Sequence, residues 1–521
     1  MPRVSRPAVL VAVLAALALG GSAVVIPALS SDSVVLSGLS RTLFNAASVK
    51  TASVSVTANG PTTLLVDGRK VASGSSGTLS ASLAGLGDGR HTITVEVENG
   101  FPHGTSRTSK TITVDSTAPT LQLAVPTKAV AIKDGVTVTG TVNKGASLLA
   151  PGGTLTQQGA SFTVRYAAPP ASAQIVATDA AGNATTQLVT VPTAYPHNIR
   201  AVHMTGAAWA YAPLRNPVLQ MIKDKRINAV QLDIKDEDGI VNYASAVPIA
   251  KAAGATSTYY DATNVTAQLH SLGVRVIGRI VAFNDPKLAS YAEAHGEKDW
   301  FIQKPDGSKY LYGYNRHGFT NFANREVRNY NEDLAVEAVK AGFDDVVYDY
   351  VRRPDGKLSG MRFPGLRGKP EVAIATFLKE TQTKIRPLGG SLGAAAFAQA
   401  STRPDSTAQN IPMMAKYLDV VIPMDYPSHW NPGEYGVPDP YIGAYDIVKR
   451  SLVDWQKDVK GTNCLVVPWL QDENYRGLYT PAKVRQQIQG ARDNGIPGWL
   501  MWSAGASYTP AAYSPDSTPA V

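Results

Sequence analysis

The sequence predicts a multidomain protein in which two all-β sandwiches precede a parallel α/β barrel of the (β/α)8, or TIM, type. Three observations support this fold class. The chain has 521 residues, which is enough for several hydrophobic cores. Short β-rich segments broken by turn residues fill its first part. Beyond Tyr195, apolar runs alternate with helical patterns, which is typical of parallel βα units.

Composition and charge narrow the classes of function. With 44% hydrophobic and 17% charged residues, the chain is globular. Its net charge of +8 comes from dispersed Lys and Arg residues without interleaved aromatics, so we expect no nucleic-acid groove. The excess is compatible with anionic wall polymers. The single cysteine, Cys464, excludes an intrachain disulfide and a thiolate metal site.

Residues 1–30 predict a signal peptide or signal anchor. Arg3 and Arg6 precede the apolar run Pro7–Leu29, and Ala28 and Ser30 are small residues suited to cleavage. An uncleaved membrane anchor is the alternative, because the apolar run is long. We therefore expect an exported protein, extracellular or at the cell surface, with residues 31–50 as a linker.

Residues 51–115 and 116–192 predict the two sandwiches. The second is entered through Asp115–Pro119 and ends with Ala177–Asn183 before a last strand. These segments resemble the bacterial immunoglobulin-like repeats that precede extracellular enzymes, which implies a spacer and says little about ligand. Strands of the first sandwich, with a turn at Asp67-Gly68, are expected at Ser53–Thr57, Thr62–Val66, His91–Val97 and Ser109–Val114.

Residues 197–510 predict the barrel, and residues 511–521 form a tail. The tail has no convincing eighth helix, so we expect the preceding sandwich to cover the last strand. The eight predicted strands are Ile199–His203, Ala229–Ile234, Arg275–Ala282, Asp345–Tyr348, Ser391–Ala396, Val420–Met424, Leu465–Leu470 and Gly498–Trp502. Helical patterns lie at Val218–Lys225, Val265–Leu272, Glu326–Ala341, Val372–Lys384, Ala408–Tyr417, Tyr445–Val459 and Pro481–Asn494.

The carboxyl ends of these strands predict one shared site, because parallel strands of a barrel present those ends at a single rim. Carboxylates, aromatic rings and an amide at one rim suit a sugar, since pyranose faces stack on aromatics and glycosidic cleavage needs two carboxyl groups. The predicted catalytic residues are Asp349, Asp472 and Asp425. The predicted substrate-binding residues are His203, Asp233, Lys235, Asp236, Arg352, Tyr426, His429, Trp469, Gln471 and Trp502.

We expect no metal ion and no organic cofactor at this rim. His203 and His429 have no H-x-x-x-H spacing and no compact His/Asp triad around them. Metal-dependent deacetylation is nevertheless a third possible activity, which inhibition by a chelator would reveal.

Six segments carry a family resemblance. They resemble the bacterial glycoside hydrolase domain family DUF4015, in order and at the right spacing, over about Arg200–Ala504. The resemblance implies a TIM-barrel, glycosidase-like domain that is usually exported, with poorly defined substrate and catalytic residues. The segments are Gln231–Gly239, Tyr348–Arg352, Pro423–Trp430, Pro432–Gly436, Pro468–Asp472 and Gly498–Trp502.

Three departures from the family pattern affect the expected chemistry. The family typically has an acidic residue at the end of strand five, where this chain has Ala394–Phe397. Arg353 stands where the family usually has Phe, and Asp425 replaces a position that is often apolar. The departures imply either a relocated carboxylate pair or a loss of activity.

The sequence therefore predicts an exported glycoside hydrolase that acts on an extracellular or cell-envelope polysaccharide. Asp349 is the expected nucleophile or water-activating base, and Asp472 or Asp425 the expected general acid. The alternative is a catalytically inactive barrel that binds glycan or envelope polymer on an immunoglobulin-like stalk. Sugar identity and oligomeric state have no signal in the sequence.

Overall fold

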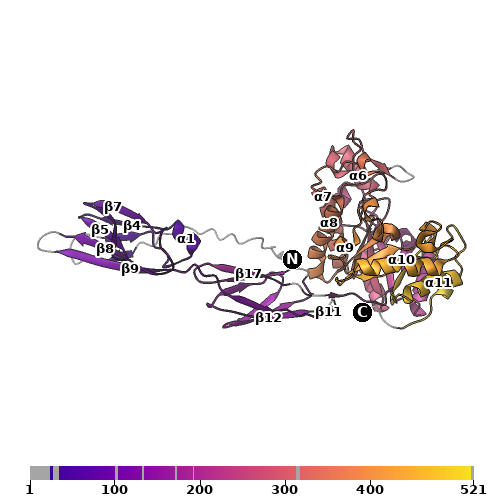
Figure 1. Cartoon of the computed structure of the whole chain (residues 1–521), viewed down its shortest axis with the longest axis horizontal. Helices are drawn as coiled ribbons and strands as arrows, with labels where there is room; N and C mark the ends of the chain where they lie inside the picture. The colour runs from indigo at the N-terminus through magenta and orange to yellow at the C-terminus, as the bar shows by residue number, and fades with distance from the viewer. Residues whose placement is uncertain are drawn as a thin grey trace, which may run out of the picture.

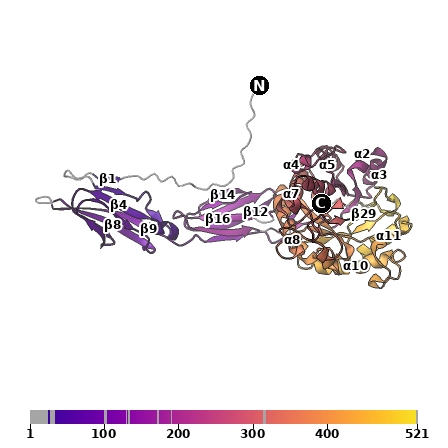
Figure 2. The same ribbon diagram turned by 90° about the horizontal axis from the view of Figure 1, so that it is seen from above.

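The computed structural model describes residues 24–26, 34–99, 104–128, 130–131, 134–170, 173–189, 191, 193–312 and 317–517. Two β-sandwiches and a barrel follow one another along the long axis of the molecule (Figure 1), and a view from above shows the same order (Figure 2). Of the predicted signal segment, only residues 24–26 are described. Among the described helices, none has the length and apolarity to cross a bilayer.

The first sandwich packs a four-stranded sheet on a five-stranded sheet. Val54 and Val56 from one sheet and Leu64 and Val95 from the other share one fully buried core. The predicted turn is present, because Asp67 and Gly68 both have positive φ, as a type I′ hairpin turn requires. One sheet comprises β1 (Val24–Ile26), β2 (Val34–Ser37), β4 (Ser53–Ala58) and β7 (Gly77–Ser82). The other comprises β3 (Leu43–Phe44), β9 (Thr105–Val114), β8 (Gly89–Glu98), β5 (Thr62–Val66) and β6 (Arg69–Gly74), with helix α1 (Ala46–Lys50) after β3.

The second sandwich has two smaller sheets around a core that includes Val138, Val164 and Ile175. A short parallel pair, β11 (Val130–Ala131) and β18 (Thr193–Ala194), leads toward the barrel. The four-stranded sheet contains β10 (Leu121–Ala124), β12 (Val136–Val142), β15 (Ser161–Tyr166) and β14 (Thr154–Gln158). The three-stranded sheet contains β13 (Ser147–Leu149), β16 (Ala173–Thr178) and β17 (Ala184–Val189).

Eight parallel strands close into a barrel, which confirms the predicted fold class. The first strand pairs with both the second and the last, so the ring has no open edge. Strand seven is split in two around Val467 and Pro468, and a proline there lacks the N–H that a continuous ladder needs. The strands are β19 (Arg200–Met204), β20 (Ala229–Lys235), β21 (Arg275–Val281), β24 (Asp345–Asp349), β25 (Ser391–Phe397), β26 (Val420–Met424), β27 (Leu465–Val466) with β28 (Trp469–Gln471), and β29 (Trp499–Trp502).

Helices cover the outside of the barrel, and most match the predicted patterns. The pattern at Ala408–Tyr417 gives only the short helix α9 (Ile411–Met414), because Ala408 has a left-handed φ and Asn410 caps the helix start. Residues between β21 and α7 form an unpredicted insertion with α6 (Pro286–Ala294), β22 (Leu311–Tyr312) and β23 (His317–Gly318). The other helices are α2 (Gly206–Ala210), α3 (Ala212–Lys223), α4 (Pro248–Ala252), α5 (Ala262–Ser271), α7 (Arg325–Lys340), α8 (Pro370–Ile385), α10 (Ala444–Asp458) and α11 (Pro481–Arg492).

The tail covers the last strand, so the expectation that the sandwich does so was wrong. The buried ring of Tyr513 packs on Trp499 of β29, with ring centroids 5.0 Å apart. Arg226 donates to the Tyr513 carbonyl at 2.7 Å, and Arg200 donates to the Asp516 carbonyl at 2.6 Å. An irregular segment therefore does what an eighth helix does in other barrels.

The second sandwich instead joins the amino-terminal end of the barrel. Thr193 donates to Asp419 at 3.0 Å, and Tyr195 donates to Asp345 at 3.0 Å. Asp345 begins β24 and Asp419 immediately precedes β26, so both acceptors lie at the amino ends of strands. The carboxyl ends, where barrel enzymes carry their sites, are consequently at the opposite end from the sandwich.

Candidate active site

A cavity of about 260 Å³ opens at the carboxyl ends of the barrel strands. Its base is the fully buried Trp469, and its walls combine carboxyl groups, two arginines and aromatic rings. The lining residues are Glu237, Arg279, Asp349, Tyr350, Arg352, Met424, Tyr426, His429, Trp469, Glu473, Tyr475 and Trp502.

Asp349 is the last residue of β24, and its carboxyl group is fixed on both oxygens. Arg279 donates to Oδ2 through Nε at 3.0 Å and through Nη2 at 2.7 Å. The backbone N–H of Tyr350 donates to Oδ1 at 2.7 Å. Tyr350 has a φ of 49°, an uncommon conformation for a residue with a side chain, and it ends the strand abruptly there. The carboxyl group therefore has one orientation at the cavity wall.

Arg279 is the centre of a buried ionic network beneath the cavity. Besides Asp349, it donates to Asp233 at 3.0 Å and to Glu237. Burial alone lowers the pKa of Arg279, but Glu237, Asp233 and Asp349 together raise that pKa well above its ordinary value. Because Glu237 and Asp349 bind the same guanidinium nitrogen, their nearest oxygens lie within about 5 to 6 Å of each other.

His203 and Asp233 form the layer below Arg279. His203 Nε2 lies 2.8 Å from Asp233 Oδ1, and the imidazole stacks on Trp502 at 4.6 Å. Burial alone raises the pKa of Asp233, but the charges of His203 and Arg279 outweigh burial and lower that pKa. Both residues are buried and do not line the cavity, so their influence on it passes through Arg279 and Trp502.

Tyr426, His429 and Glu473 also line the cavity. Glu473 Oε2 accepts the backbone N–H of Ala504 at 2.7 Å. Burial raises the pKa of Tyr426 well above its ordinary value, and the negative charges of Asp349 and Glu473 raise it further. Tyr426 lines the same cavity as both carboxyl groups. Burial and the charge of Arg476 lower the pKa of His429, which favours a neutral imidazole.

The structure brings six of the predicted residues together around the cavity. Besides Asp349, these are Arg352, Tyr426, His429, Trp469 and Trp502. Arg352 donates to Asp355 at 3.0 Å and to the Tyr312 hydroxyl at 3.1 Å, so the insertion between β21 and α7 orients it.

The predicted general acids Asp425 and Asp472 do not line the cavity, and this prediction is corrected. Side chains alternate along a strand, and both residues point outward from the barrel. Asp425 accepts Trp430 Nε1 and Ser451 Oγ, each at 2.8 Å, between the barrel and α10. Asp472 accepts the hydroxyl of Tyr513 and the backbone N–H of Thr509, the latter at 2.7 Å. Burial raises the pKa of both carboxyl groups, that of Asp425 to about 7.

Lys235, Asp236 and Gln471 also lie outside the cavity lining. A register shift after Asp233 turns Lys235 outward, where it pairs with Asp285 at 2.6 Å. Asp236 accepts the Ile240 N–H at 2.9 Å within its own loop, and burial raises its pKa to about 6. The Gln471 amide donates to backbone carbonyls of the loop that follows β28.

Sequence reasoning missed Glu473, Glu237 and Arg279 as site residues. Glu473 lies two residues beyond the end of β28 (Trp469–Gln471), so strand alternation does not predict its direction. Glu237 lies in a loop after β20, where no strand periodicity applies. Arg279 lies within β21, and its role depends on which carboxyl groups surround it in the folded barrel.

The buried Asp425 predicts a stability that falls as pH rises. Its pKa is about 7 in the folded protein and about 3.9 in an unfolded chain, so the folded state binds the proton more tightly. Between about pH 4 and pH 7 this group therefore lowers the free energy of unfolding by up to about 4 kcal/mol, and the loss is complete above the folded pKa.

Asp425→Asn, which imitates the neutral acid, should flatten this decline. Urea unfolding of the wild-type protein and the variant, followed by tryptophan fluorescence at about pH 5 and about pH 8, measures the free energy of unfolding. An equal pH dependence in the two proteins contradicts the prediction. All seven tryptophans lie beyond Tyr195, so the signal reports the barrel.

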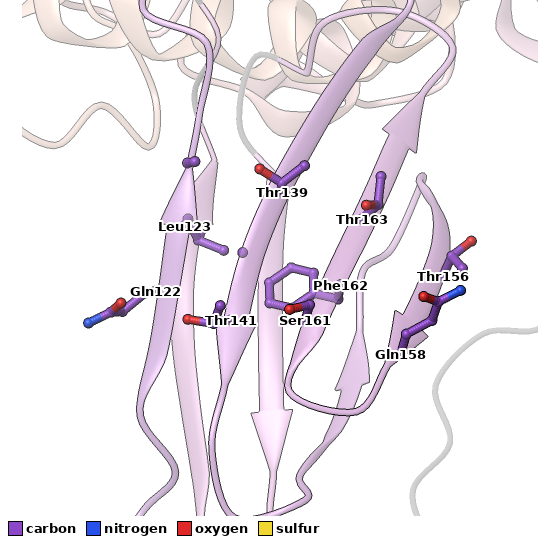
Figure 3. Close-up of a pocket in the computed structure, with 11 residues that line it drawn as sticks. Gln122, Leu123, Thr139, Thr141, Thr156, Gln158, Ser161, Phe162 and Thr163 are labelled. Atoms are coloured by element: carbon purple, nitrogen blue, oxygen red, sulfur yellow. The ribbon is translucent and has the colours of Figure 1, made fainter.

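A second hollow, of about 730 Å³, lies on the four-stranded sheet of the second sandwich (Figure 3). Hydroxyl and amide side chains such as Thr139, Thr141 and Gln158 surround it, and the described residues that line it include no carboxyl group. It therefore lacks the acid and base that the barrel cavity has. In the described part of the chain, no three His, Cys, Asp or Glu side chains gather as a metal ligand set.

Comparison with known proteins gives a family match over the barrel. The family described as "Putative glycosyl hydrolase domain" (DUF4015) matches residues 201–508. No curated protein matches the chain. A crystal structure of a hypothetical protein from Ruminiclostridium thermocellum ATCC 27405 is 28% identical, covering 37% of this chain and 96% of that one, with a TM-score of 0.33.

Two other solved structures are more distant in sequence. The PgaB (BpsB) glycoside hydrolase domain from Bordetella bronchiseptica is 15% identical over 59% of this chain and 94% of that one, with a TM-score of 0.45. The α-galactosidase TtGalA from Thermus thermophilus is 13% identical over 82% of this chain and 88% of that one, with a TM-score of 0.38.

Proposed function

The chain belongs to the DUF4015 family of glycosyl hydrolase domains, and from that premise we propose that it is an exported glycosidase that cleaves an envelope or extracellular polysaccharide with Asp349 and Glu473. The observation that carries this proposal is the cavity itself. It gathers carboxyl groups from the ends of different strands and the loops that follow them, beside aromatic faces at the end of the barrel where such enzymes act.

Asp349 is the proposed nucleophile or water-activating base. Arg279 holds its Oδ2, whereas Oδ1 accepts a single backbone N–H and has a further lone pair for the substrate. A fixed carboxylate with one available oxygen suits attack on an anomeric carbon, either directly or through a water.

Glu473 is the proposed general acid. Among the described residues, no Lys or Arg forms an ion pair with it, and the Ala504 N–H engages only Oε2. Glu237 is less suited to donate a proton, because its carboxylate is paired with Arg279. In the proposed reaction, Glu473 transfers its proton to the glycosidic oxygen as the bond to the anomeric carbon breaks.

The remaining lining groups fit a sugar ring. Trp502 and Tyr426 offer apolar faces 6.5 Å apart at an interplanar angle of 27°. Arg352, Glu237 and His429 supply donors and acceptors for hydroxyl groups. The departure at strand five removes a carboxylate that the family usually has, and Glu473 offers a replacement from strand seven.

Export and envelope association rest on the sequence of residues 1–30 and on the place of the sandwiches. Because the second sandwich joins the barrel end opposite the cavity, the two sandwiches are suited to hold the cavity away from an anchored amino terminus. Mass spectrometry of the amino terminus of secreted protein, with cell fractionation, tests export; a protein retained in the cytoplasm contradicts it.

Glu473→Gln should lower kcat by about 10²- to 10⁴-fold on a natural glycan found in a polysaccharide panel. The loss should be much smaller on aryl glycosides, whose leaving groups need no proton. The matched control is Asp238→Asn, an exposed carboxylate beyond the cavity lining that should retain activity. Equal losses on both kinds of substrate contradict the assignment, and a wild-type protein that binds glycan without turnover supports the inactive-barrel alternative.

A further inference from the structure

A line of aromatic rings runs from the base of the cavity to its rim. Trp469 and Trp502 have ring centroids 5.0 Å apart, and Trp502 stacks on Tyr426 at 6.5 Å. Tyr426 is followed by His429 at 5.2 Å, and His429 by Tyr475 at 5.9 Å. The proposed chemistry at Asp349 and Glu473 accounts for the inner rings and leaves the outermost one without a role.

Tyr475 differs from the inner rings because it is exposed. It is 48% exposed, whereas Trp469 is fully buried and Tyr426 is 6% exposed. An aromatic ring that faces water at the edge of a ligand cavity is typical of a binding surface, since it has apolar area to bury only when a partner arrives. Its neighbour Arg476 lies over the ring, 5.5 Å from its centroid, and adds a hydrogen-bond donor beside it.

The loop that carries Tyr475 is held in place by several contacts. The Gln471 amide donates to the carbonyls of Glu473 at 3.2 Å and Tyr475 at 3.3 Å. Arg476 has a φ of 56° and donates to the Ser428 carbonyl at 3.2 Å, which ties the loop to the segment bearing His429. At Gly477 a Cβ atom would lie 2.3 Å from the Tyr441 ring, so only glycine allows this close approach. The exposed ring is therefore presented from a fixed backbone.

We infer that Tyr475 is an outer sugar subsite, so that the substrate is a polysaccharide chain that leaves the cavity over this ring. The inference rests on the proposed function and makes it more specific: Glu473 acts on the bond inside the cavity, and Tyr475, two residues later, stacks on a sugar farther along the same chain. Tyr475 lines the cavity at its exposed edge, so a short oligosaccharide held between Asp349 and Glu473 in the inner part does not extend over this ring.

Chain length is the variable that tests this subsite. Tyr475→Ala should lower kcat/KM on the order of tenfold for long chains and leave the shortest cleavable oligosaccharide unchanged. Tyr475→Phe should behave as wild type, because stacking needs the ring and not the hydroxyl. The matched control is Tyr259→Ala, which removes a tyrosine of similar exposure, 44%, that does not line the cavity. Equal effects of Tyr475→Ala on short and long substrates overturn the inference.

A binding measurement separates this inference from the proposed function. Asp349→Asn, with and without Tyr475→Ala, is titrated with short and long fragments of cellulose, chitin, starch, dextran and peptidoglycan glycan strands. The expected result is that Tyr475→Ala weakens the binding of the long fragments alone, by a factor similar to its effect on kcat/KM. If the wild-type protein binds these fragments but never cleaves them, the proposed hydrolase function is contradicted. A loss of binding that is confined to the long fragments then still supports the subsite. A length-independent loss, or no glycan binding at all, overturns it.

Discussion

Asp349→Asn is expected to lower kcat for glycan hydrolysis by at least about 10³-fold while the protein still binds its substrate. The amide has nearly the same shape as the carboxylate but cannot attack an anomeric carbon or take a proton from water. The fold should tolerate the change, because Arg279 keeps its contacts with Asp233 and Glu237. Steady-state kinetics on the best glycan of the panel, with binding titrations in parallel, measure both properties.

The control for this variant is its stability. The urea midpoint of Asp349→Asn should stay close to that of the wild-type protein, so that lost turnover is not lost folding. Activity within a few-fold of wild type would show that the reaction does not use Asp349. The hydrolase account would then need a different carboxyl pair, with Glu237 and Glu473 the remaining carboxyl groups that line the cavity.

Arg279→Met should give the largest loss of stability, about 3 to 5 kcal/mol in the free energy of unfolding. The change leaves Asp349, which is 3% exposed, without its cation, and it leaves the fully buried Asp233 with His203 as its remaining partner. Hydrolysis should also be lost, because the carboxyl group of Asp349 is no longer fixed. Urea unfolding followed by tryptophan fluorescence reports the barrel alone, since all seven tryptophans lie in it.

Arg450→Met is the matched control for the buried network. Arg450 pairs with Asp446 at 3.0 Å on the surface of α10, and both side chains are about half exposed. An exposed pair of this kind contributes less than about 1 kcal/mol. If Arg279→Met is no more destabilising than Arg450→Met, the carboxyl groups beneath the cavity do not depend on Arg279 for their burial.

The barrel strands could be predicted because parallel strands are buried on both faces and read as continuous apolar runs. Val346, Val347 and Tyr348 form such a run. Asp349 ends it and lines the cavity, because the carboxyl ends of barrel strands face the site. The same logic placed Trp469, Tyr426 and Trp502 correctly. Export and the site roles of these residues are predictions that await experiment.

The choice of general acid failed for a physical reason. Asp425 directly follows an apolar run, and Asp472 follows Leu470 by two residues, but a displacement of one residue along a strand reverses the side-chain direction. Tyr426, two residues after Met424, lines the cavity with it, whereas Glu473 lies in the loop after β28 and enters the cavity through the course of that loop.

The packing of the tail on the last strand, β29, could not be predicted from the sequence. Tyr513 lies in a Ser- and Pro-rich tail without periodicity, and its packing on Trp499 depends on tertiary contacts alone. The insertion that orients Arg352 through Tyr312 is equally irregular. Such segments are fixed by the surfaces on which they pack and not by a local pattern.

The most direct test of the account is the structure of Glu473→Gln with a bound oligosaccharide of the cleaved glycan. The account predicts a glycosidic oxygen within hydrogen-bond distance of the residue 473 side chain, with the adjoining anomeric carbon facing Asp349. An oligosaccharide bound on another face of the protein, or bound in the cavity with its glycosidic bond out of reach of both side chains, would contradict it.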